Sequence, residues 1–167
     1  MLKENKGITM ISLVITIIVL MILASITTSS GLSTAREARY YRAIHEMKVM
    51  QAEVNQWYED RKDGDTTNWD KGIPILSSGK ESKCITAYTS ARDNNLTDSN
   101  IGDIAKFKFF STDAIKDDLD IEGISHDFII NLDSRCVILV DGITKNGVNY
   151  YSLGEIEDEQ YNVDYIE

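Results

Sequence analysis

Residues 6–58 read KGITMISLVITIIVLMILASITTSSGLSTAREARYYRAIHEMKVMQAEVNQWY, and this stretch decides the fold. No charged residue occurs between Gly7 and Ala35. As an α-helix, residues 8–26 alone would extend about 28 Å, which is close to the thickness of a hydrocarbon core. The first half of the stretch therefore predicts a transmembrane helix.

The second half of the stretch is amphipathic. From Arg36 onward charged residues appear, while apolar residues return at helical spacing. These apolar residues are Tyr40, Ala43, Ile44, Met47, Met50, Val54, Trp57 and Tyr58. No proline separates the halves, so we expect one helix that ends near Asp60 and packs its apolar stripe on the rest of the chain. Met47, Met50 and Val54 are predicted core residues.

Length and charge limit what the rest of the chain can be. The 167 residues carry a net charge of -10, and most of the acidic excess lies beyond residue 59. The length left after the helix suits one small domain. An acidic surface repels phosphate groups, so no nucleic-acid partner is expected.

Short β-rich runs follow the helix. Residues 73–76, 83–88 and 105–110 are strand-like, and residues 112–119 predict a short helix capped by Thr112. Runs at 127–132, 135–140 and 147–153 predict an antiparallel meander, with the last two joined by a loop containing Asn146 and Gly147. One face of this meander would be apolar through Phe128, Ile130, Val137 and Leu139, or through their alternates. The predicted fold class is α+β, with a long N-terminal helix, half transmembrane and half amphipathic, packed on a small antiparallel β-sheet head.

This prediction divides the chain into four parts. They are a leader at 1–7, a hydrophobic transmembrane and assembly helix at 8–34, its amphipathic continuation at 35–60, and a β-rich head at 61–167. Lys3 and Lys6 precede the apolar run, and positive charge keeps that end of a membrane helix in the cytoplasm. The head is therefore expected outside the cell.

The apolar run admits three interpretations. A cleaved secretory signal is one, because Ala24, Ser25 and Thr27 supply small residues near a cleavage point. An uncut transmembrane anchor is the second. The third depends on the residues around Gly7.

The string from Lys6 to Ile15, KGITMISLVI, resembles the class III signal of type IV pilins and type II secretion pseudopilins. The resemblance implies that prepilin peptidase cuts after Gly7 and that Ile8 becomes the N-methylated first residue. It also implies that the apolar helix lies in membrane lipid before assembly and then packs against homologous pilin subunits.

The chain departs from the family pattern at two positions. The family usually has a glutamate where this chain has Ser12, and often a proline where it has Ser29. In the family the glutamate is thought to meet the amine of a neighbouring subunit, and a serine cannot neutralise an amine. Either this subunit caps a filament tip, or its filament is held in register by packing alone, with Ser12 as an assembly position.

Two cysteines, Cys84 and Cys136, fall in the predicted head. Outside the cell they could form a stabilising disulfide. Two buried thiols are the alternative.

Asp93, Asp98 and Asp103 in the acidic stretch 93–103 are calcium candidates, because carboxylate oxygens bind calcium. The resemblance supports them, since some pseudopilins bind calcium in a head loop. The spacing does not fit an EF-hand, and a solvated loop is the alternative. No other cofactor is expected. His45 and His126 have no convincing partner in sequence, so no enzyme is expected.

Taken together, these features predict a structural subunit of a type IV pilus-like filament, first a single-pass membrane protein with its head outside and then part of an extracellular filament. The alternative is a non-assembling, single-pass membrane-anchored extracellular binding protein.

Overall fold

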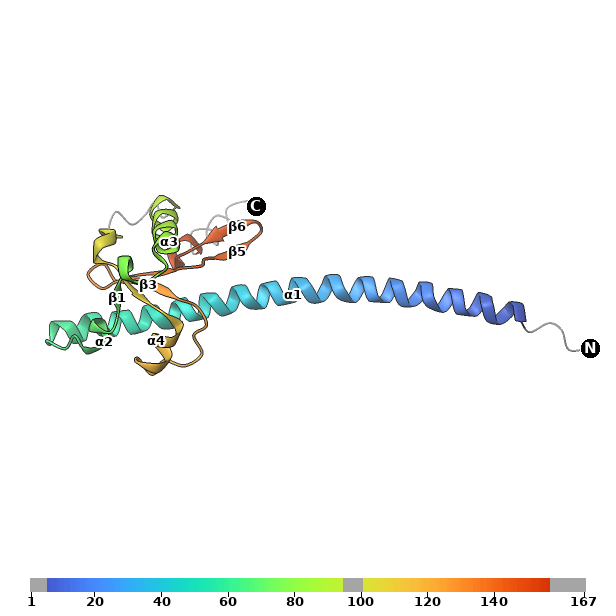
Figure 1. Cartoon of the computed structure of the whole chain (residues 1–167), viewed down its shortest axis with the longest axis horizontal. Coiled ribbons are helices and arrows are strands. Elements are labelled where there is room, and N and C mark those ends of the chain that lie inside the picture. The colour runs from blue at the N-terminus through green and yellow to red at the C-terminus, as the bar shows by residue number, and fades with distance from the viewer. Residues whose placement is uncertain (1–5, 95–100, 157–167) are drawn as a thin grey trace, which may run out of the picture. The chain divides into compact units, whose positions relative to one another are not determined.

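The computed structural model describes residues 6–94 and 101–156, without the side chains of residues 6–11, 22–33 and 94. The chain separates into two compact units, Met1–Arg39 and Tyr40–Glu167, and each is considered by itself. Helix α1 (Lys6–Lys62) is 57 residues long and contributes to both units (Figure 1). The other helices are α2 (Thr67–Asp70), η1 (Ile75–Ser77), α3 (Glu81–Asn94), η2 (Ile104–Lys106) and α4 (Thr112–Asp117).

The strands of the second unit form two antiparallel sheets. The larger sheet has the order β1-β2-β3-β4, with strands β1 (Ile73–Pro74), β2 (Lys108–Phe110), β3 (Phe128–Asn131) and β4 (Cys136–Leu139). Its register pairs Phe110 with Phe128 and Phe128 with Leu139. The smaller sheet is a hairpin of β5 (Ile143–Lys145) and β6 (Val148–Tyr150).

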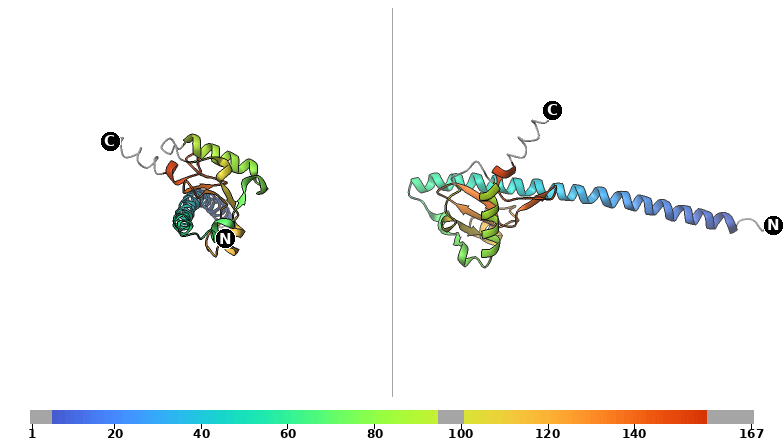
Figure 2. Two further views of the ribbon diagram at one scale, coloured as in Figure 1. Left: turned by 90° about the vertical axis from the view of Figure 1, so that its left-hand side faces the viewer. Right: turned by 90° about the horizontal axis from the view of Figure 1, so that it is seen from above.

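The larger sheet is buried on both faces. Figures 1 and 2 show the C-terminal part of α1 on one side of it and α3 on the other. The α1 side is a cluster of the apolar stripe with Phe110, Phe128, Ile130, Val137 and Leu139. Met47, Met50 and Val54 are fully buried there, so the prediction that these residues are core residues is confirmed.

The opposite face of the sheet packs on α3. Cys84, Ala87 and Ala91 recur at helical spacing along α3, and all three are fully buried in a cluster that includes Ile129 and Ile138. The strand predicted for residues 83–88 is therefore wrong. The run KCITAY contains β-branched residues, which favour a strand. However, only a helix brings Cys84, Ala87 and Ala91 to one face, and their burial against the sheet stabilises the helix.

The C-terminal strands also differ from the expected meander. The residues Asn146 and Gly147 have φ values of 53° and 84°, as a tight two-residue hairpin turn requires. This turn joins β5 to β6, whereas we expected it to join β6 to the strand that is now β4. The sequence analysis missed β5 because it is only three residues long.

Smaller corrections concern boundaries. Ser111, rather than Thr112, caps α4, because its side chain accepts a hydrogen bond from the Ala114 amide. Residues 73–76 divide between β1 and η1, and residues 105–110 between η2 and β2.

The predicted transmembrane half is wrong. Within the described part of the chain, no helix combines the length and the apolar character that crossing a bilayer requires. The described apolar side chains in this part of α1 cover residues 12–21, which extend about 15 Å, half the thickness of a hydrocarbon core. The finding also overturns the single-pass membrane protein of the predicted localisation and the membrane anchor of the alternative interpretation.

Candidate functional site: the exposed apolar segment of α1

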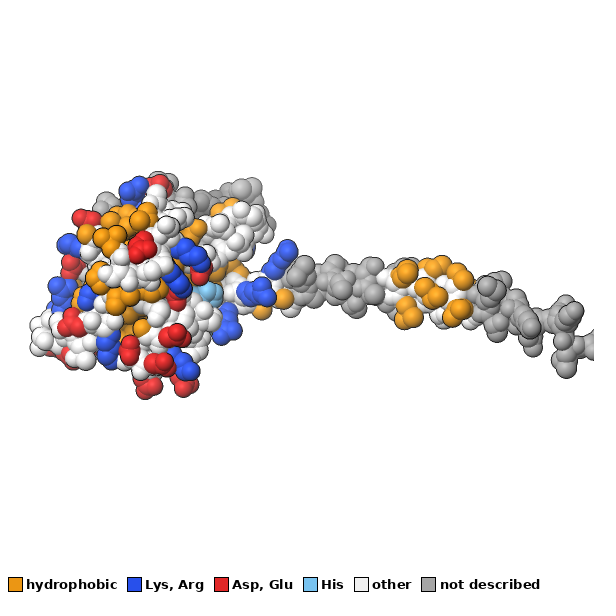
Figure 3. Space-filling view, viewed as in Figure 1, with side chains coloured by type: hydrophobic (Ala, Val, Ile, Leu, Met, Phe, Trp, Pro, Cys, Tyr) orange, Lys and Arg blue, Asp and Glu red, His pale blue; other side chains and the backbone are white. Residues whose placement is uncertain are grey.

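Residues 12–21 of α1 form the most unusual surface of the first unit. Their large apolar side chains are exposed by 45% at Ile17 to 66% at Met21. The exposed residues are Leu13, Val14, Ile15, Ile17, Ile18, Val19, Leu20 and Met21. Figure 3 shows hydrophobic side chains gathered along this part of the helix. We call residues 12–21 the apolar segment.

This surface surrounds the helix instead of forming a stripe. Successive residues of an α-helix are rotated by about 100°, so the run from Leu13 to Ile15 and the run from Ile17 to Met21 together reach every side except the sector that Ser12 and Thr16 share. A helix that is apolar all round is normally enclosed by other groups. The apolar segment is therefore a surface that needs several neighbours.

One of the two polar side chains of the segment, Thr16, is bonded within its own helix. The hydroxyl oxygen Oγ1 of Thr16 lies 3.0 Å from the carbonyl oxygen of Ser12 and 2.8 Å from that of Leu13, and its proton is donated to these acceptors. A threonine that bonds to its own helix in this way offers no donor to a partner. The surface thus behaves as almost entirely apolar.

The composition of the segment makes its helix dependent on packing. Six of its ten residues, at positions 14–19, are β-branched, and such residues lose side-chain freedom in a helix. Covering one half-exposed Leu, Ile or Val side chain would contribute about 1 kcal/mol. Contact along the whole segment therefore provides both association energy and support for the helical conformation.

The predicted processing residues lie at the beginning of α1. Gly7 and Ile8 are helical, and their side-chain surroundings lie outside the described part. Ser12 is exposed, and its carbonyl oxygen is one of the two acceptors for Thr16. The structure thus places Ser12 at one end of the apolar segment.

The predicted disulfide is not formed. Cys84 in α3 is fully buried, Cys136 in β4 is half-buried, and the two thiols are not joined. Both belong to or pack against the apolar cluster between α3 and the sheet. Burial raises the pKa of the Cys84 thiol and so disfavours the reactive thiolate.

The calcium candidates are not brought together. Asp93 forms an ion pair with Arg92, and Asp103 accepts a hydrogen bond from the Ala105 amide at the start of η2. Asp98 lies outside the described residues. Over residues 6–94 and 101–156, the structure contains no group of three or more acidic, histidine or cysteine side chains that could hold a metal ion.

The sequence analysis missed a buried carboxylate, Glu46, which is 1% exposed. Its Oε1 accepts hydrogen bonds from Arg42 Nε at 3.1 Å and from the Ser125 hydroxyl at 2.8 Å. Its Oε2 accepts from the Ser125 amide at 2.9 Å and lies 2.7 Å from Nδ1 of His126. Burial acts to raise the pKa of Glu46, but the bonds from His126 and Ser125 outweigh it and lower this pKa. The sequence does indicate this burial, because Glu46 follows Ala43 by three residues and so lies at the helical spacing of the apolar stripe.

The combination of Ser125, His126 and Glu46 does not have the geometry of a catalytic triad. A triad needs the serine and the acid on different ring nitrogens of the histidine. Here the Ser125 hydroxyl and the Glu46 carboxylate both face Nδ1, and the hydroxyl also donates to the carboxylate. The arrangement therefore holds a loop on α1 and does not activate the serine.

The next residue, Asp127, joins two more elements. Its Oδ1 accepts hydrogen bonds from the amide and hydroxyl of Thr112, at 2.8 and 2.9 Å, and its Oδ2 forms an ion pair with Lys80. Burial opposes the charge of Asp127, but these bonds lower its pKa overall. Residues 125–127 thus tie together α1, the start of α4 and the residue before α3.

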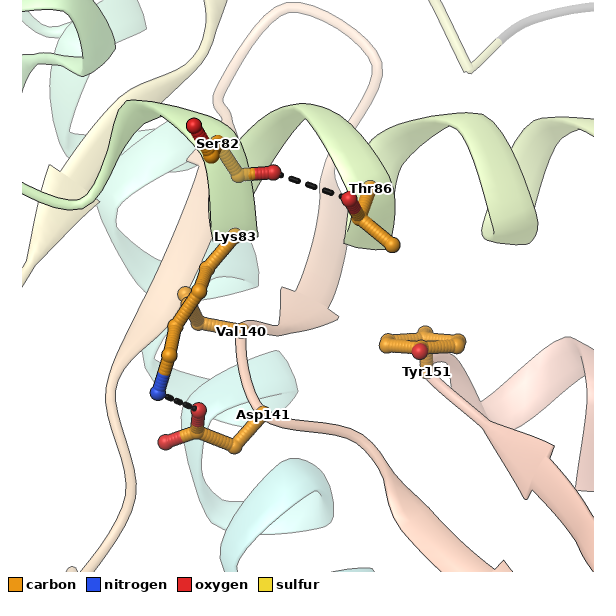
Figure 4. Close-up of a pocket in the computed structure, with 6 residues that line it drawn as sticks. All are labelled: Ser82, Lys83, Thr86, Val140, Asp141 and Tyr151. Atoms are coloured by element: carbon orange, nitrogen blue, oxygen red, sulfur yellow. Dashed lines mark hydrogen bonds and ion pairs between the residues drawn. The ribbon is translucent and has the colours of Figure 1, made fainter.

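A shallow pocket of about 300 Å³ lies between α3 and the segments around Val140 and Tyr151 (Figure 4). Lys83 and Asp141 line it but form an ion pair with each other at 2.6 Å. The Thr86 hydroxyl donates to the carbonyl oxygen of Ser82. Because these groups bind each other, we assign no ligand to the pocket.

Comparison of the chain with family models, with curated proteins and with solved structures gives no match.

Proposed function

We propose that this chain is the structural subunit of a type IV pilus-like filament, cut after Gly7 and assembled through residues 8–34 of α1. The observation that carries the proposal is the apolar segment, which exposes apolar side chains on nearly every side of the helix. The KGITMISLVI string supports the proposed cleavage and the methylation of Ile8.

The all-round exposure favours a polymer over a pair of subunits. A two-stranded coiled coil covers only one stripe of each helix, and most of the apolar segment would stay exposed in it. Several copies of the same segment, packed side by side, would cover all its faces. When one head-to-tail operation repeats without closing, the product is a filament.

The second unit supports this role because its own core is complete. The apolar stripe of α1 is already covered by the sheet, and it takes no part in the exposed surface. Each subunit would then contribute one adhesive helix segment and one folded body.

The first test is the amino terminus of the mature chain in its native host. We expect mass spectrometry to find a chain that begins at a methylated Ile8, and we expect Gly7→Val to remain uncut and to be missing from the filament fraction. An intact Met1 in assembled material, or a terminus near Thr27, would contradict the proposal.

The second test concerns Ser12. If the filament is held in register by packing alone, wild-type chains should be present along its whole length. Ser12→Glu then gives no large gain in incorporation. If the wild-type chain appears as one copy per filament and only Ser12→Glu assembles in quantity, the chain is a tip subunit instead.

A further inference from the structure

We propose that Arg36 and Arg39 of one copy dock on the acidic surface around α4 of the next copy. This inference builds on the proposed function, since it identifies the contact that would set the register between subunits whose affinity comes from the apolar segment. It concerns two charged surfaces that form no ion pair with each other's kind among the described residues of one chain.

The first surface is a basic face of α1 in the first unit. Arg36 and Arg39 are three residues apart and are therefore neighbours on one side of the helix. Ala35 lies beside Arg39 on this side of the helix, whereas Glu37 and Ala38 point elsewhere. All these residues are exposed, and neither arginine forms an ion pair with any described residue. The small side chain of Ala35 would let another chain approach the arginines closely.

The second surface is the acidic face that α4 and the following residues form in the second unit. Its five exposed carboxylates belong to Asp113, Asp117, Asp118, Asp120 and Glu122. Figure 3 shows acidic side chains gathered over α4. Lys116 lies among them, and Lys71 donates to the carbonyl oxygen of Asp118, so negative charge remains in excess. Within the described residues, none of the five carboxylates has an ion-pair partner.

Elsewhere in the second unit, several basic residues are already engaged by nearby acids. Arg61 and Lys106 bind Asp133, and Lys83 binds Asp141. Residues 40–167 contain 13 basic and 25 acidic residues, whereas residues 8–39, the part of the first unit that remains after the proposed cleavage, contain two basic residues and one acidic residue. The first unit of another copy therefore supplies the charge that the α4 surface lacks.

The two surfaces are different from each other, and this determines the kind of assembly. A contact between unlike surfaces is heterologous, so it adds subunits head to tail and does not close into a symmetric pair. Exposed ion pairs change an equilibrium constant by no more than about fivefold each. Their main effects would be on register and on the rate of addition, both of which salt weakens.

The experiment measures the critical concentration of the full-length processed chain by sedimentation, with electron microscopy of the pellet. We expect Arg39→Glu to raise the critical concentration about tenfold at low salt, because attraction is replaced by repulsion. The matched control is Lys48→Glu, an exposed residue of α1 with the same change of charge, which should behave as wild type. Raising the salt from about 50 to about 500 mM should weaken wild-type assembly and reduce the difference between the variants.

The acidic side is tested by Asp117→Lys with Asp118→Lys, against Asp63→Lys as an exposed control. The basic and the acidic variants should each assemble poorly alone, whereas an equimolar mixture should form copolymers, because one copy's reversed α1 meets another's reversed α4 surface. If wild type assembles and neither reversal has more effect than its control, the docking proposal is wrong and the proposed function remains. If wild type forms no polymer under any of these conditions, the proposed function is wrong.

Discussion

Helix α1 contains two apolar regions, one exposed and one buried. The apolar segment, residues 12–21, exposes its large side chains, whereas Met47, Met50 and Val54 in the stripe are fully buried. The difference lies in what surrounds each region. The stripe occupies one side of the helix and is covered by the sheet, while the segment is apolar on nearly all sides and no described residue of its own unit covers it. Apolar composition alone therefore does not decide burial; the angular distribution of the apolar residues decides what kind of partner can cover them.

The largest expected effect tests the buried region. Met50→Ala should lower the free energy of unfolding by about 2–5 kcal/mol, because it leaves a cavity in a packed core. Urea unfolding of the full chain, under conditions without assembly, measures this loss. Leu20→Ala in the exposed segment is the matched control and should change the stability by less than about 0.5 kcal/mol. Equal effects of the two substitutions would remove the distinction between the regions.

The second prediction concerns the one carboxylate in the stripe. Glu46→Gln should cost about 2 kcal/mol at neutral pH, because an amide cannot accept all the hydrogen bonds that now reach both carboxylate oxygens. The folded state lowers the pKa of Glu46, so its contribution is complete above its unfolded pKa of about 4.3 and is lost as the pH falls through the lower folded pKa. The difference in the free energy of unfolding between wild type and Glu46→Gln should therefore be smaller at pH 3 than at pH 7.

Glu53→Gln provides the control for this measurement. Glu53 is half-buried on the same helix and has no role in the contacts with residues 125–127. It should change the stability little at either pH. A loss at Glu53→Gln as large as that at Glu46→Gln would show that the measurement reports the net charge of α1 and not the buried contacts.

A smaller effect is expected at the cap of α4. Ser111→Ala should cost about 1 kcal/mol, because the Ala114 amide loses its acceptor. Ser111→Asp keeps an acceptor and should retain most of the stability. Phe110 precedes Ser111 in the chain and is one of the sheet residues that pack on the α1 stripe. A much larger loss of stability would therefore mean that the packing of the sheet on α1 depends on α4. Thermal unfolding of the three chains separates these outcomes.

The smallest effect is expected where α1 meets solvent. Oδ1 of Asp133 lies 2.6 Å from Nη1 of Arg61, and Oδ2 lies 3.2 Å from Nζ of Lys106. All three side chains are about half exposed. The two partners lower the pKa of Asp133, yet exposed pairs contribute less than about 1 kcal/mol. Asp133→Asn should therefore be nearly neutral in urea unfolding and indistinguishable from wild type at high salt. A loss above about 2 kcal/mol would place Asp133 among the buried contacts.

The sequence predicted well the features that depend on local periodicity. The stripe from Tyr40 to Trp57 follows a helical period over five turns, and its burial could be read from that period alone. Residues 83–88 failed because six residues are too few to distinguish a strand from a helix. Adding Ala91 to Cys84 and Ala87 would have given the helical period.

The remaining misses depend on distant partners. Glu46 and Ser125 are 79 residues apart, and nothing in either local sequence identifies the other. The apolar run at residues 8–34 predicted a membrane span by composition, whereas the described helices include none that could cross a bilayer. For the candidate site, the sequence located the apolar segment but gave no indication of the internal hydrogen bonds of Thr16.

The contact between Glu46 and residues 125–126 also has a consequence for synthesis on the ribosome. At about 5–20 residues per second, Ser125 is added about 4–16 s after Glu46. Throughout that interval the stripe of α1 has been made while the strands that cover it have not. An ionised Glu46 would be hydrated in this nascent chain and would interrupt the apolar stripe with a charge. The most deeply buried of the described acids would thus keep the unfinished chain soluble until its partners are translated.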